Sequence, residues 1–174
     1  MDYKNKHIVL VGLMGAGKTS AGRQLASLLK RPFYDTDLEA EYSAGLRISD
    51  IFEIYGEPTF RELEEKVVLR VLKENEPSVI ATGGGAYMSE KSQKNIAKHG
   101  ISVWLNASLD ILMDRIVTTA HRPILQQGDR RETLKALIEK RYPIYARADV
   151  HINVDKGSAT TMARRIRKKL EEAS

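Results

Sequence analysis

The segment from Gly12 to Thr19 limits the possible folds of this 174-residue chain more than any other part of the sequence. It reads GLMGAGKT, fits the pattern G-x-x-x-x-G-K-[ST] and directly follows the apolar run Ile8 to Val11. Glycines let a backbone wrap so that successive N–H groups and a helix N-terminus face one anion. Lys18 adds a positive charge for the phosphates, and the Thr19 hydroxyl suits a magnesium ion. We therefore expect nucleoside triphosphate binding rather than an ordinary glycine turn.

Short apolar runs recur along the chain, and helical patterns separate them. The runs are Ile8–Val11, Phe33–Asp35, Val79–Ala81, Val103–Leu105 and Val150–Val154. Most are rich in β-branched residues, which is typical of strands buried in a parallel sheet. Apolar residues at helical spacing after Lys18 and from Phe60 to Leu72 predict helices between the strands. Without repeats or linkers, residues 1–174 are predicted to form one three-layer α/β domain, whose ligands bind beyond the carboxyl ends of the strands.

The composition excludes several classes of protein. The absence of cysteine excludes disulfides, thiol nucleophiles and cysteine-containing metal sites, and the histidines at 7, 99, 121 and 151 lack metal-ligand spacing. No apolar stretch predicts a signal peptide or a membrane span, so we expect a cytoplasmic protein without a membrane partner. The net charge of +5 equals the charge of segment 164–169 (RRIRKK). This favours a solvated helix face, with a phosphate or partner contact as the alternative, over a nucleic-acid surface.

Two carboxylates follow the second predicted strand. Asp35 and Asp37 lie two residues apart, so in an extended chain both project to the same side. One could hold water on magnesium, while the other accepts a proton or a hydrogen bond from an acceptor hydroxyl. Asp37 could instead cap a helix that begins at Leu38. Both interpretations are open at this point.

Three glycines and two arginines add to the pattern. Gly83, Gly84 and Gly85 follow the third strand, where they expose backbone N–H groups to a neighbouring ligand. Arg61 begins an acidic helical segment, and Arg141 lies in KRYPIY, where the proline is expected to disrupt a helix. Either arginine alone is typical of a surface ion pair, Arg61 with Glu64 or Glu65 for example. The chain has no Asn-Lys-x-Asp element for reading guanine and no room for a mechanical domain, which favours a small-molecule phosphotransferase.

Taken in order, these motifs resemble the shikimate kinase family across nearly the whole chain. The motifs are GLMGAGKT at 12–19, Asp35-Thr-Asp37, Phe60-Arg61, Thr82-Gly-Gly-Gly85, Arg122-Pro123 and Arg141-Tyr-Pro-Ile-Tyr145. The resemblance implies a P-loop kinase fold similar to nucleoside monophosphate kinases, with a five-stranded parallel sheet. It also implies a helical substrate-binding region at about 36–64 and a mobile lid at about 117–131. The implied activity is ATP- and Mg²⁺-dependent phosphorylation of the shikimate 3-hydroxyl, a step of chorismate and aromatic amino-acid biosynthesis.

The resemblance also assigns roles to individual residues. The residues it assigns to ATP are Gly15, Ala16, Gly17, Lys18, Thr19, Ser20, Arg115, which stacks on adenine, and Arg122, which closes over the transferring phosphate. The residues it assigns to shikimate are Asp37, Ile48, Phe52, Phe60, Arg61, Glu64, Gly83, Gly84, Gly85 and Arg141. Arg61 and Arg141 hold the carboxylate, while Asp37 contacts the reacting hydroxyl. Thr19 binds Mg²⁺ directly and Asp35 binds it through water, so the implied catalytic set is Lys18, Asp35, Asp37 and Arg122.

Several alternatives stay open beside this assignment. Phe52 could be a plain core residue, and Arg122 a solvated loop charge. The segment 155–159 (DKGSA) is plainer than in many relatives, which leaves the adenine contact there undetermined, and His121 has no interpretation. A kinase for gluconate, another sugar acid or a nucleotide is the nearest rival. A nucleotide-dependent binding module without catalysis is the rival from another class. We expect a monomer whose partners are shikimate and ATP, without nucleic acid.

Overall fold

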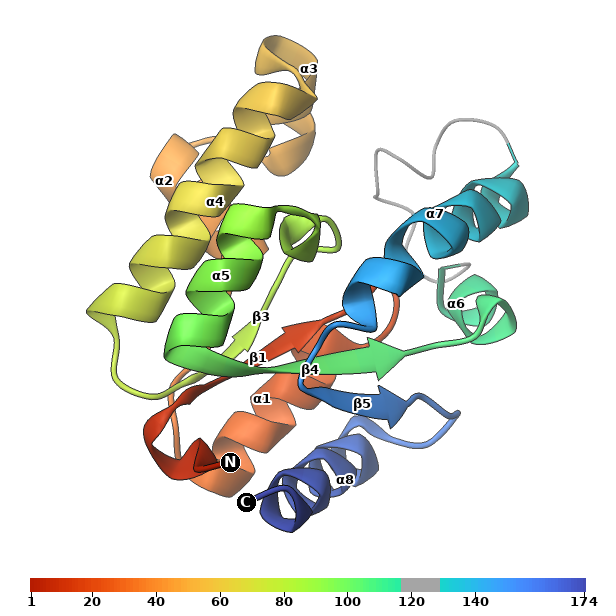
Figure 1. The fold of residues 1–174 in the computed structure, drawn as a ribbon. Coiled ribbons are helices and arrows are strands. Elements are labelled where there is room, and N and C mark those ends of the chain that lie inside the picture. Colours follow the sequence, from red (N-terminus) through yellow and green to blue (C-terminus); the bar gives the residue numbers. More distant parts are fainter. Residues whose placement is uncertain (117–128) are drawn as a thin grey trace.

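The computed structural model describes residues 1–116 and 129–174, which form one α/β domain (Figure 1). Its strands are β1 (His7–Val11), β2 (Phe33–Asp35), β3 (Val79–Ala81), β4 (Gly100–Asn106) and β5 (Val150–Asn153). Its α-helices are α1 (Lys18–Leu29), α2 (Thr36–Ala44), α3 (Ile48–Tyr55), α4 (Glu57–Glu74), α5 (Glu90–His99), α6 (Leu109–Ile116), α7 (Arg130–Tyr145) and α8 (Ala159–Glu172). Short 3₁₀ turns lie at Tyr3–Asn5 and Ala86–Met88.

The five strands form one parallel sheet in the order β2-β3-β1-β4-β5. This confirms the predicted three-layer fold and all five predicted strands. The strand β4 is longer than the apolar run Val103–Leu105 because it pairs with the whole of β1, from His7 opposite Gly100 to Val11 opposite Trp104. Backbone pairing therefore extends the strand beyond the residues that an apolar pattern can reveal.

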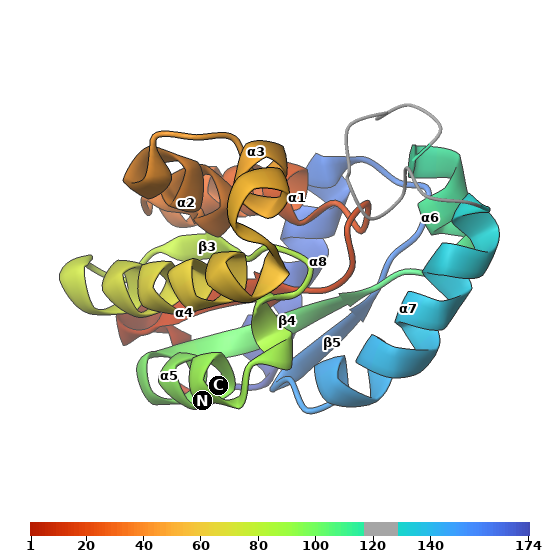
Figure 2. The ribbon, with the colours of Figure 1, turned by 90° about the horizontal axis from the view of Figure 1, so that it is seen from above.

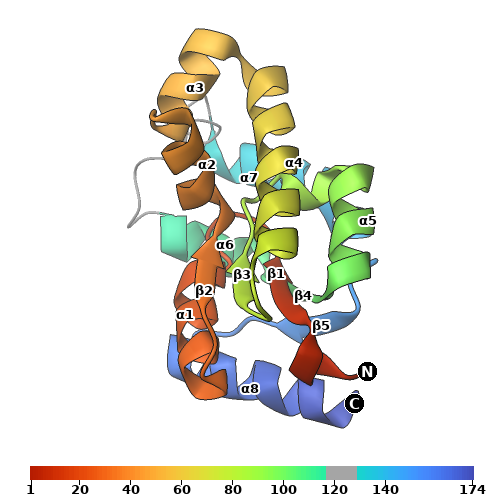
Figure 3. The same cartoon turned by 90° about the vertical axis from the view of Figure 1, so that its left-hand side faces the viewer.

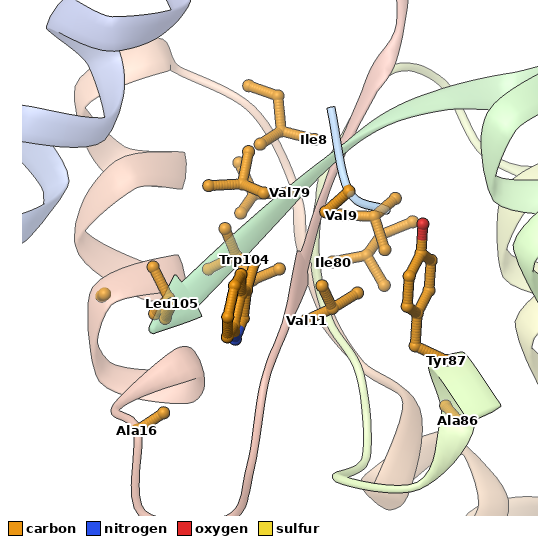
Figure 4. Packing of buried hydrophobic residues seen from close by; sticks show 14 of the residues in the cluster. Ile8, Val9, Val11, Ala16, Val79, Ile80, Ala86, Tyr87, Trp104 and Leu105 are labelled. Atoms are coloured by element: carbon orange, nitrogen blue, oxygen red, sulfur yellow. The ribbon is translucent and has the colours of Figure 1, made fainter. Parts of the chain in front are cut away.

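The core lies on both faces of the central strand. Helices α1 and α8 cover one face of the sheet, and α4, α5 and α7 cover the other (Figures 1 and 2). Figure 4 shows Ile8 and Val79 on the side of α1, and Val9, Ile80 and Tyr87 on the opposite side. Because successive side chains of a strand point to opposite faces, each strand contributes to both layers of the core.

The carboxyl ends of the strands meet along one edge, and three helices project beyond it. Figure 3 shows α2, α3 and the first part of α4 standing above the sheet, while the second part of α4 runs alongside the strands. The buried residues of that second part are Val67, Val68, Val71 and Leu72, which pack into the core. The first part of α4 carries Phe60, Arg61 and Glu64 above the edge. One helix thus joins the core to the region predicted to bind the acceptor.

Two expectations about the segment before and within α7 are wrong. The predicted loop at about 117–131 extends too far, because Asp129 caps α7 by accepting from the Arg131 N–H, and Arg130 and Arg131 are helical. Pro143 does not disrupt α7, which continues to Tyr145. Its missing N–H falls in the last turn of the helix, so its effect is confined to the end. Residues 117–128, with His121 and Arg122, lie outside the described residues.

The basic segment at the end of the chain lies on α8. Its apolar side is buried through Met162, Ala163, Ile166 and Leu170, and α8 packs against α1. Arg167 and Lys168 form ion pairs within the helix, and Arg165 pairs with Asp155 at 3.0 Å. Three of the five positive charges of segment 164–169 therefore pair with nearby carboxylates on a solvated helix face. None of the described helices is long and apolar enough to span a membrane.

Candidate active site

The phosphate loop connects β1 to α1 with its backbone in conformations that favour glycine. Gly15 has φ 84° and Gly17, the N-cap of α1, has φ 95°. The buried Lys18 amine donates to the carbonyls of Gly12 at 2.6 Å and Leu13 at 2.8 Å. The lysine therefore lies folded along its own loop, with its charge beside the loop backbone.

A cavity of about 410 Å³ opens at this loop. It is lined by residues 15–21, Asp35, Asp37, Thr82, Gly84, Arg115, Gly157, Ser158, Ala159 and Met162. The structure thus brings together every described residue that the sequence assigned to ATP, from Gly15 to Ser20 together with Arg115. Residues 157–159 belong to the segment whose adenine contact the sequence left undetermined, and they line this cavity, whereas Met162 beside them was missed. No local pattern marks it, because the packing of α8 against α1 brings it to the loop.

Arg115 makes hydrogen bonds to two segments at this cavity, the phosphate loop and the segment after β5. Its guanidinium donates to the carbonyl of Ala16 at 2.9 Å and to those of Gly15 and Asp155, both at 3.3 Å. A Cβ at Gly17 would lie 2.6 Å from its Nη1 atom. The planar cation therefore lies directly against the phosphate loop, between that loop and the segment after β5.

The two aspartates occupy different structural positions. Asp35 is the N-cap of α2: one carboxylate oxygen accepts from the N–H of Asp37 at 2.9 Å, and the other accepts from the Thr19 hydroxyl at 2.9 Å. Asp37 lies inside the first turn of α2. The expectation of an extended Asp35–Asp37 pair is wrong, and so is a helix start at Leu38. The capping role belongs to Asp35 because its carboxylate meets the first free N–H groups of the helix.

A second cavity, of about 100 Å³, lies beneath the projecting helices. It is lined by Met14, Asp37, Ile48, Phe52, Phe60, Arg61, Glu64, Gly84, Gly85 and Arg141. Phe52 and Phe60 pack together with ring centroids 4.9 Å apart, so Phe52 belongs both to the apolar cluster and to the cavity wall. Met14 was missed by the sequence analysis, since it occupies a variable position of the phosphate loop and reaches this cavity only through the fold.

Arg61 and Glu64 form a partly buried ion pair in the second cavity. Their side chains are 2.8 Å apart, and Glu57 contributes a longer contact at 3.3 Å. Burial raises the pKa of Glu64, Arg61 opposes this shift, and the nearby Asp37 carboxylate adds to it. For Arg61, burial lowers the pKa, but the carboxylates of Glu64 and Glu57 reverse the direction, so its pKa is raised. The predicted ion pair is therefore with Glu64.

Arg141 reaches the same cavity from α7. Arg141 is 7% exposed, and its Nη1 atom is buried with no hydrogen-bond partner among the described residues. A surface ion pair is therefore wrong for Arg141. A buried guanidinium nitrogen that lacks an acceptor and faces a cavity is suited to an anionic ligand group, because an unmet buried donor costs free energy. Arg61 and Arg141 approach this cavity from two separate helices.

The three glycines allow charged side chains to lie directly on the loop after β3. A Cβ at Gly83 would collide with the Asp37 carboxylate and would lie 2.9 Å from Oε2 of Glu64. A Cβ at Gly85 would lie 2.6 Å from Cζ of Arg61. The sequence predicted exposed backbone N–H groups here. The structure adds a steric reason for the glycines, since a side chain at 83 or 85 would displace the groups that line the second cavity.

Comparisons with known proteins match this arrangement. The family model described as shikimate kinase matches residues 14–171. This chain belongs to the shikimate kinase family. Among curated shikimate kinases, one from Bartonella quintana is 50% identical over 159 residues, which cover 91% of this chain and 75% of the relative.

Solved structures of shikimate kinases share the fold as well. The shikimate kinase from Acinetobacter baumannii, solved in complex with shikimate, superposes with a TM-score of 0.93 at 36% identity, covering 98% of this chain and 95% of that chain. A gluconokinase from Sinorhizobium meliloti reaches a TM-score of 0.55 at 16% identity, covering 98% of both chains, which is a likeness of fold alone.

Proposed function

We propose that this shikimate kinase family member transfers the γ-phosphate of ATP to the 3-hydroxyl of shikimate, giving shikimate 3-phosphate and ADP. The observation that carries the proposal is that Asp37 and Gly84 line both cavities. A donor phosphate on the phosphate loop and an acceptor in the second cavity would therefore meet at these two residues. Transfer between positioned groups needs such a shared boundary.

The second cavity fits a small hydroxy acid. Arg61 and Arg141 supply two guanidinium groups, which recognise a carboxylate through paired hydrogen bonds. Ile48, Phe52 and Phe60 supply an apolar wall for a carbon ring. Gly84 would donate its backbone N–H to the carboxylate, and Glu64 would orient Arg61. Together these groups favour a cyclic acid such as shikimate, which a relative of known structure binds.

The chain's own residues would act mainly by position and charge. Lys18 would stabilise negative charge on the β- and γ-phosphates, and Asp37 would orient the acceptor hydroxyl and accept its hydrogen bond or proton. Because the transition state of phosphoryl transfer is loose, charge neutralisation contributes more than proton removal. Arg115 would stack on adenine, with the wall at 157–159 as its partner across the cavity. The role of Arg122 in covering the phosphate is a prediction from the sequence alone.

We infer that Mg²⁺ accompanies the nucleotide. The Thr19 hydroxyl and the Asp35 carboxylate are 2.9 Å apart in the wall of the first cavity, and Mg²⁺ prefers hydroxyl and carboxylate oxygens. Thr19 would bind the ion directly and Asp35 through water. When bound, Mg²⁺ neutralises phosphate charge. The cytoplasmic location, the monomeric state and the division into a substrate-binding region and a lid are predictions from the sequence.

ADP release from the purified protein with ATP and Mg²⁺ tests the function directly. Shikimate, quinate, gluconate, AMP and no acceptor are compared, and the mass of the product is measured. We expect turnover with shikimate alone. Turnover with gluconate or AMP would assign the chain to another acceptor. ATP binding without any turnover, together with salt-sensitive binding of duplex DNA, would support a binding module instead.

The Asp37→Asn variant tests the proposed reacting residue. It keeps the size of the side chain but removes its charge, so we expect kcat to fall at least about 100-fold, within the range for general acid–base groups. The dissociation constant of shikimate, measured by calorimetry, should change much less, because the carboxylate of the substrate is held by the arginines. An unchanged kcat would remove Asp37 from the reaction.

A further inference from the structure

We propose that the buried hydroxyls of Thr36 and Tyr145 position the Gly83–Gly84 backbone and thereby fix the acceptor relative to Asp37. The inference rests on the proposed function, because it concerns the same acceptor site. Neither residue lines either cavity. Both would therefore act through the glycine loop and are positioning residues rather than catalytic ones.

The glycine loop needs such supports. Gly83, Gly84 and Gly85 carry no side chains that could pack and hold the loop, and glycine has more conformational freedom than any other residue. Yet Gly84 lines both cavities, and Gly83 lies against the Asp37 carboxylate. Groups at a reaction site have to be held to within about 0.5 Å. The required order has to come from contacts that other segments make with the loop backbone.

Thr36 provides the first contact. Its hydroxyl accepts a hydrogen bond of 3.0 Å from the Gly83 N–H, and the residue is 1% exposed. Thr36 is the first residue of α2 and stands between Asp35 and Asp37. The hydrogen bond therefore ties the glycine loop to the helical turn that carries the proposed reacting carboxylate, so that Asp37 and Gly83 are held in one unit.

Tyr145 provides the second contact, on the next residue of the loop. Its hydroxyl donates to the Gly84 carbonyl, and the residue is fully buried at the end of α7. Burial raises the pKa of Tyr145, so its hydroxyl stays a donor at every physiological pH. Arg141 lies one helical turn earlier on the same side of α7. One helix thus presents a guanidinium to the acceptor cavity and holds the carbonyl of Gly84, which lies beside that guanidinium.

Tyr142 offers a matched control in the same helix. Its hydroxyl donates to the carbonyl of Ala107, in the loop after β4, and its ring meets Trp104 edge-on with centroids 5.1 Å apart. Tyr145 also packs on Trp104, at 6.1 Å. A change to phenylalanine keeps either ring and removes one hydrogen bond to a backbone carbonyl. At Tyr145 it also removes the contact of the hydroxyl with the Arg141 side chain, so Thr36→Val tests the support of the loop without that contact. The two variants differ in which loop loses its support.

The experiment measures kcat and the KM values for shikimate and ATP in the full chain and four variants. We expect Tyr145→Phe and Thr36→Val to raise KM for shikimate about tenfold, the factor that corresponds to the net worth of one hydrogen bond. KM for ATP should stay within about twofold, a small change on the same scale. Thr36→Ser, which keeps the hydroxyl, should restore the parent values, and Tyr142→Phe should leave both KM values unchanged. Thermal unfolding is measured for each variant.

The outcomes separate the possible explanations. Equal KM values for Tyr145→Phe and Tyr142→Phe, or Thr36→Ser behaving like Thr36→Val, would overturn the inference and leave the hydroxyls as supports of the fold. A loss shared equally by shikimate and ATP would do the same, since it would indicate general damage. If the parent itself does not phosphorylate shikimate, the proposed function fails and the inference with it. Turnover by the parent therefore distinguishes the two failures.

Discussion

The Thr19 hydroxyl donates a hydrogen bond of 2.9 Å to the Asp35 carboxylate, whose other oxygen caps α2. One carboxylate thereby joins the helix of the phosphate loop to the helix that carries Asp37. Two oxygens that suit Mg²⁺ are held side by side by helix geometry rather than by a flexible loop.

Removing the Thr19 hydroxyl should weaken the use of Mg²⁺. We expect Thr19→Val to raise the Mg²⁺ concentration for half-maximal activity by at least about tenfold, the lower end of the losses seen when a metal site loses a supporting group. Thr19→Ser keeps the hydroxyl and should stay near the parent. Titration of Mg²⁺ at fixed ATP measures the effect, and activity should vanish on chelation. Equal titrations for valine and serine would show that Thr19 does not hold the ion.

Alanine at two positions of the glycine loop should damage different kinetic parameters. Neither Gly83 nor Gly85 has a positive φ, so alanine fits their backbone and only its Cβ matters. At position 83 the Cβ comes closer to the Asp37 carboxylate than to Oε2 of Glu64, so we expect the main effect to be a fall in kcat by about 100-fold, as for a misplacement of about 1 Å. At position 85 the Cβ displaces the Arg61 guanidinium, so KM for shikimate should rise instead. Steady-state kinetics give kcat and KM for both variants. If both variants changed the same parameter by the same factor, this assignment would be contradicted.

The buried Glu64 should cost stability at neutral pH. Because burial raises its pKa in the folded protein, the folded state binds a proton more readily than the unfolded one. Stability from this group is present below the unfolded pKa of about 4.5 and is lost as pH rises through the folded pKa. Glu64→Gln should therefore raise the unfolding temperature at pH 7.5, by about 2–4 °C for each kcal/mol, while weakening shikimate binding through Arg61.

A control for Glu64→Gln is available at the next position. Glu65 accepts a hydrogen bond of 2.8 Å from Ser89 and does not line either cavity. Glu65→Gln should leave KM for shikimate unchanged. Calorimetric melting at pH 4.5 and pH 7.5 compares the unfolding temperatures of the parent and the two variants. If Glu64→Gln is less stable than the parent at pH 7.5, the ion pair with Arg61 stabilises the fold by more than the burial of Glu64 costs.

His7 should make the fold sensitive to mild acid. Its Nδ1 accepts from the Ser78 N–H at 3.1 Å, so the neutral ring can donate only from Nε2, to the Leu72 carbonyl at 3.0 Å. Burial lowers the pKa of His7, so below about 6.5 the unfolded chain binds a proton that the folded chain does not. Stability is complete above that pH and falls as pH drops toward the folded pKa. Urea unfolding between pH 7.5 and 5 should show this decline, and His7→Gln should flatten it; an unchanged slope would contradict it.

The sequence was sufficient where local chemistry determines the structure. The phosphate loop needs glycine at positive φ and a following helix, and both requirements are visible in GLMGAGKT. The apolar runs predicted all five strands because buried parallel strands tolerate few polar residues. The ends of β1 and β5 differ from the predicted runs by one residue each, and the larger difference is the length of β4, because pairing with β1 and β5 rather than side-chain pattern sets its ends.

The sequence was insufficient where two distant segments meet. Sequence alone predicts the same surface ion pair for Arg61 and Arg141. In the structure Arg61 pairs with Glu64, whereas Arg141 is buried and its Nη1 atom has no hydrogen-bond partner among the described residues. That difference depends on the packing of α7 beside the glycine loop. The sequence does not show which of Asp35 and Asp37 caps the helix, because either aspartate could do so. An extended pair was therefore expected, whereas Asp35 caps α2 and Asp37 lies in its first turn.

Lysine substitutions at three arginines should separate the two substrates. Arg61→Lys and Arg141→Lys remove planar guanidinium groups from the acceptor cavity, so we expect the dissociation constant of shikimate to rise about tenfold or more and that of ATP to change little. Arg115→Lys should do the reverse, because lysine cannot hold the carbonyls of Ala16 and Asp155 together at the nucleotide cavity. Calorimetric titration of each of the three variants with each of the two substrates measures the six dissociation constants. Equal losses of affinity for both substrates in all three variants would refute the assignment of Arg61 and Arg141 to the shikimate carboxylate, because a general loosening of the fold would weaken both cavities alike.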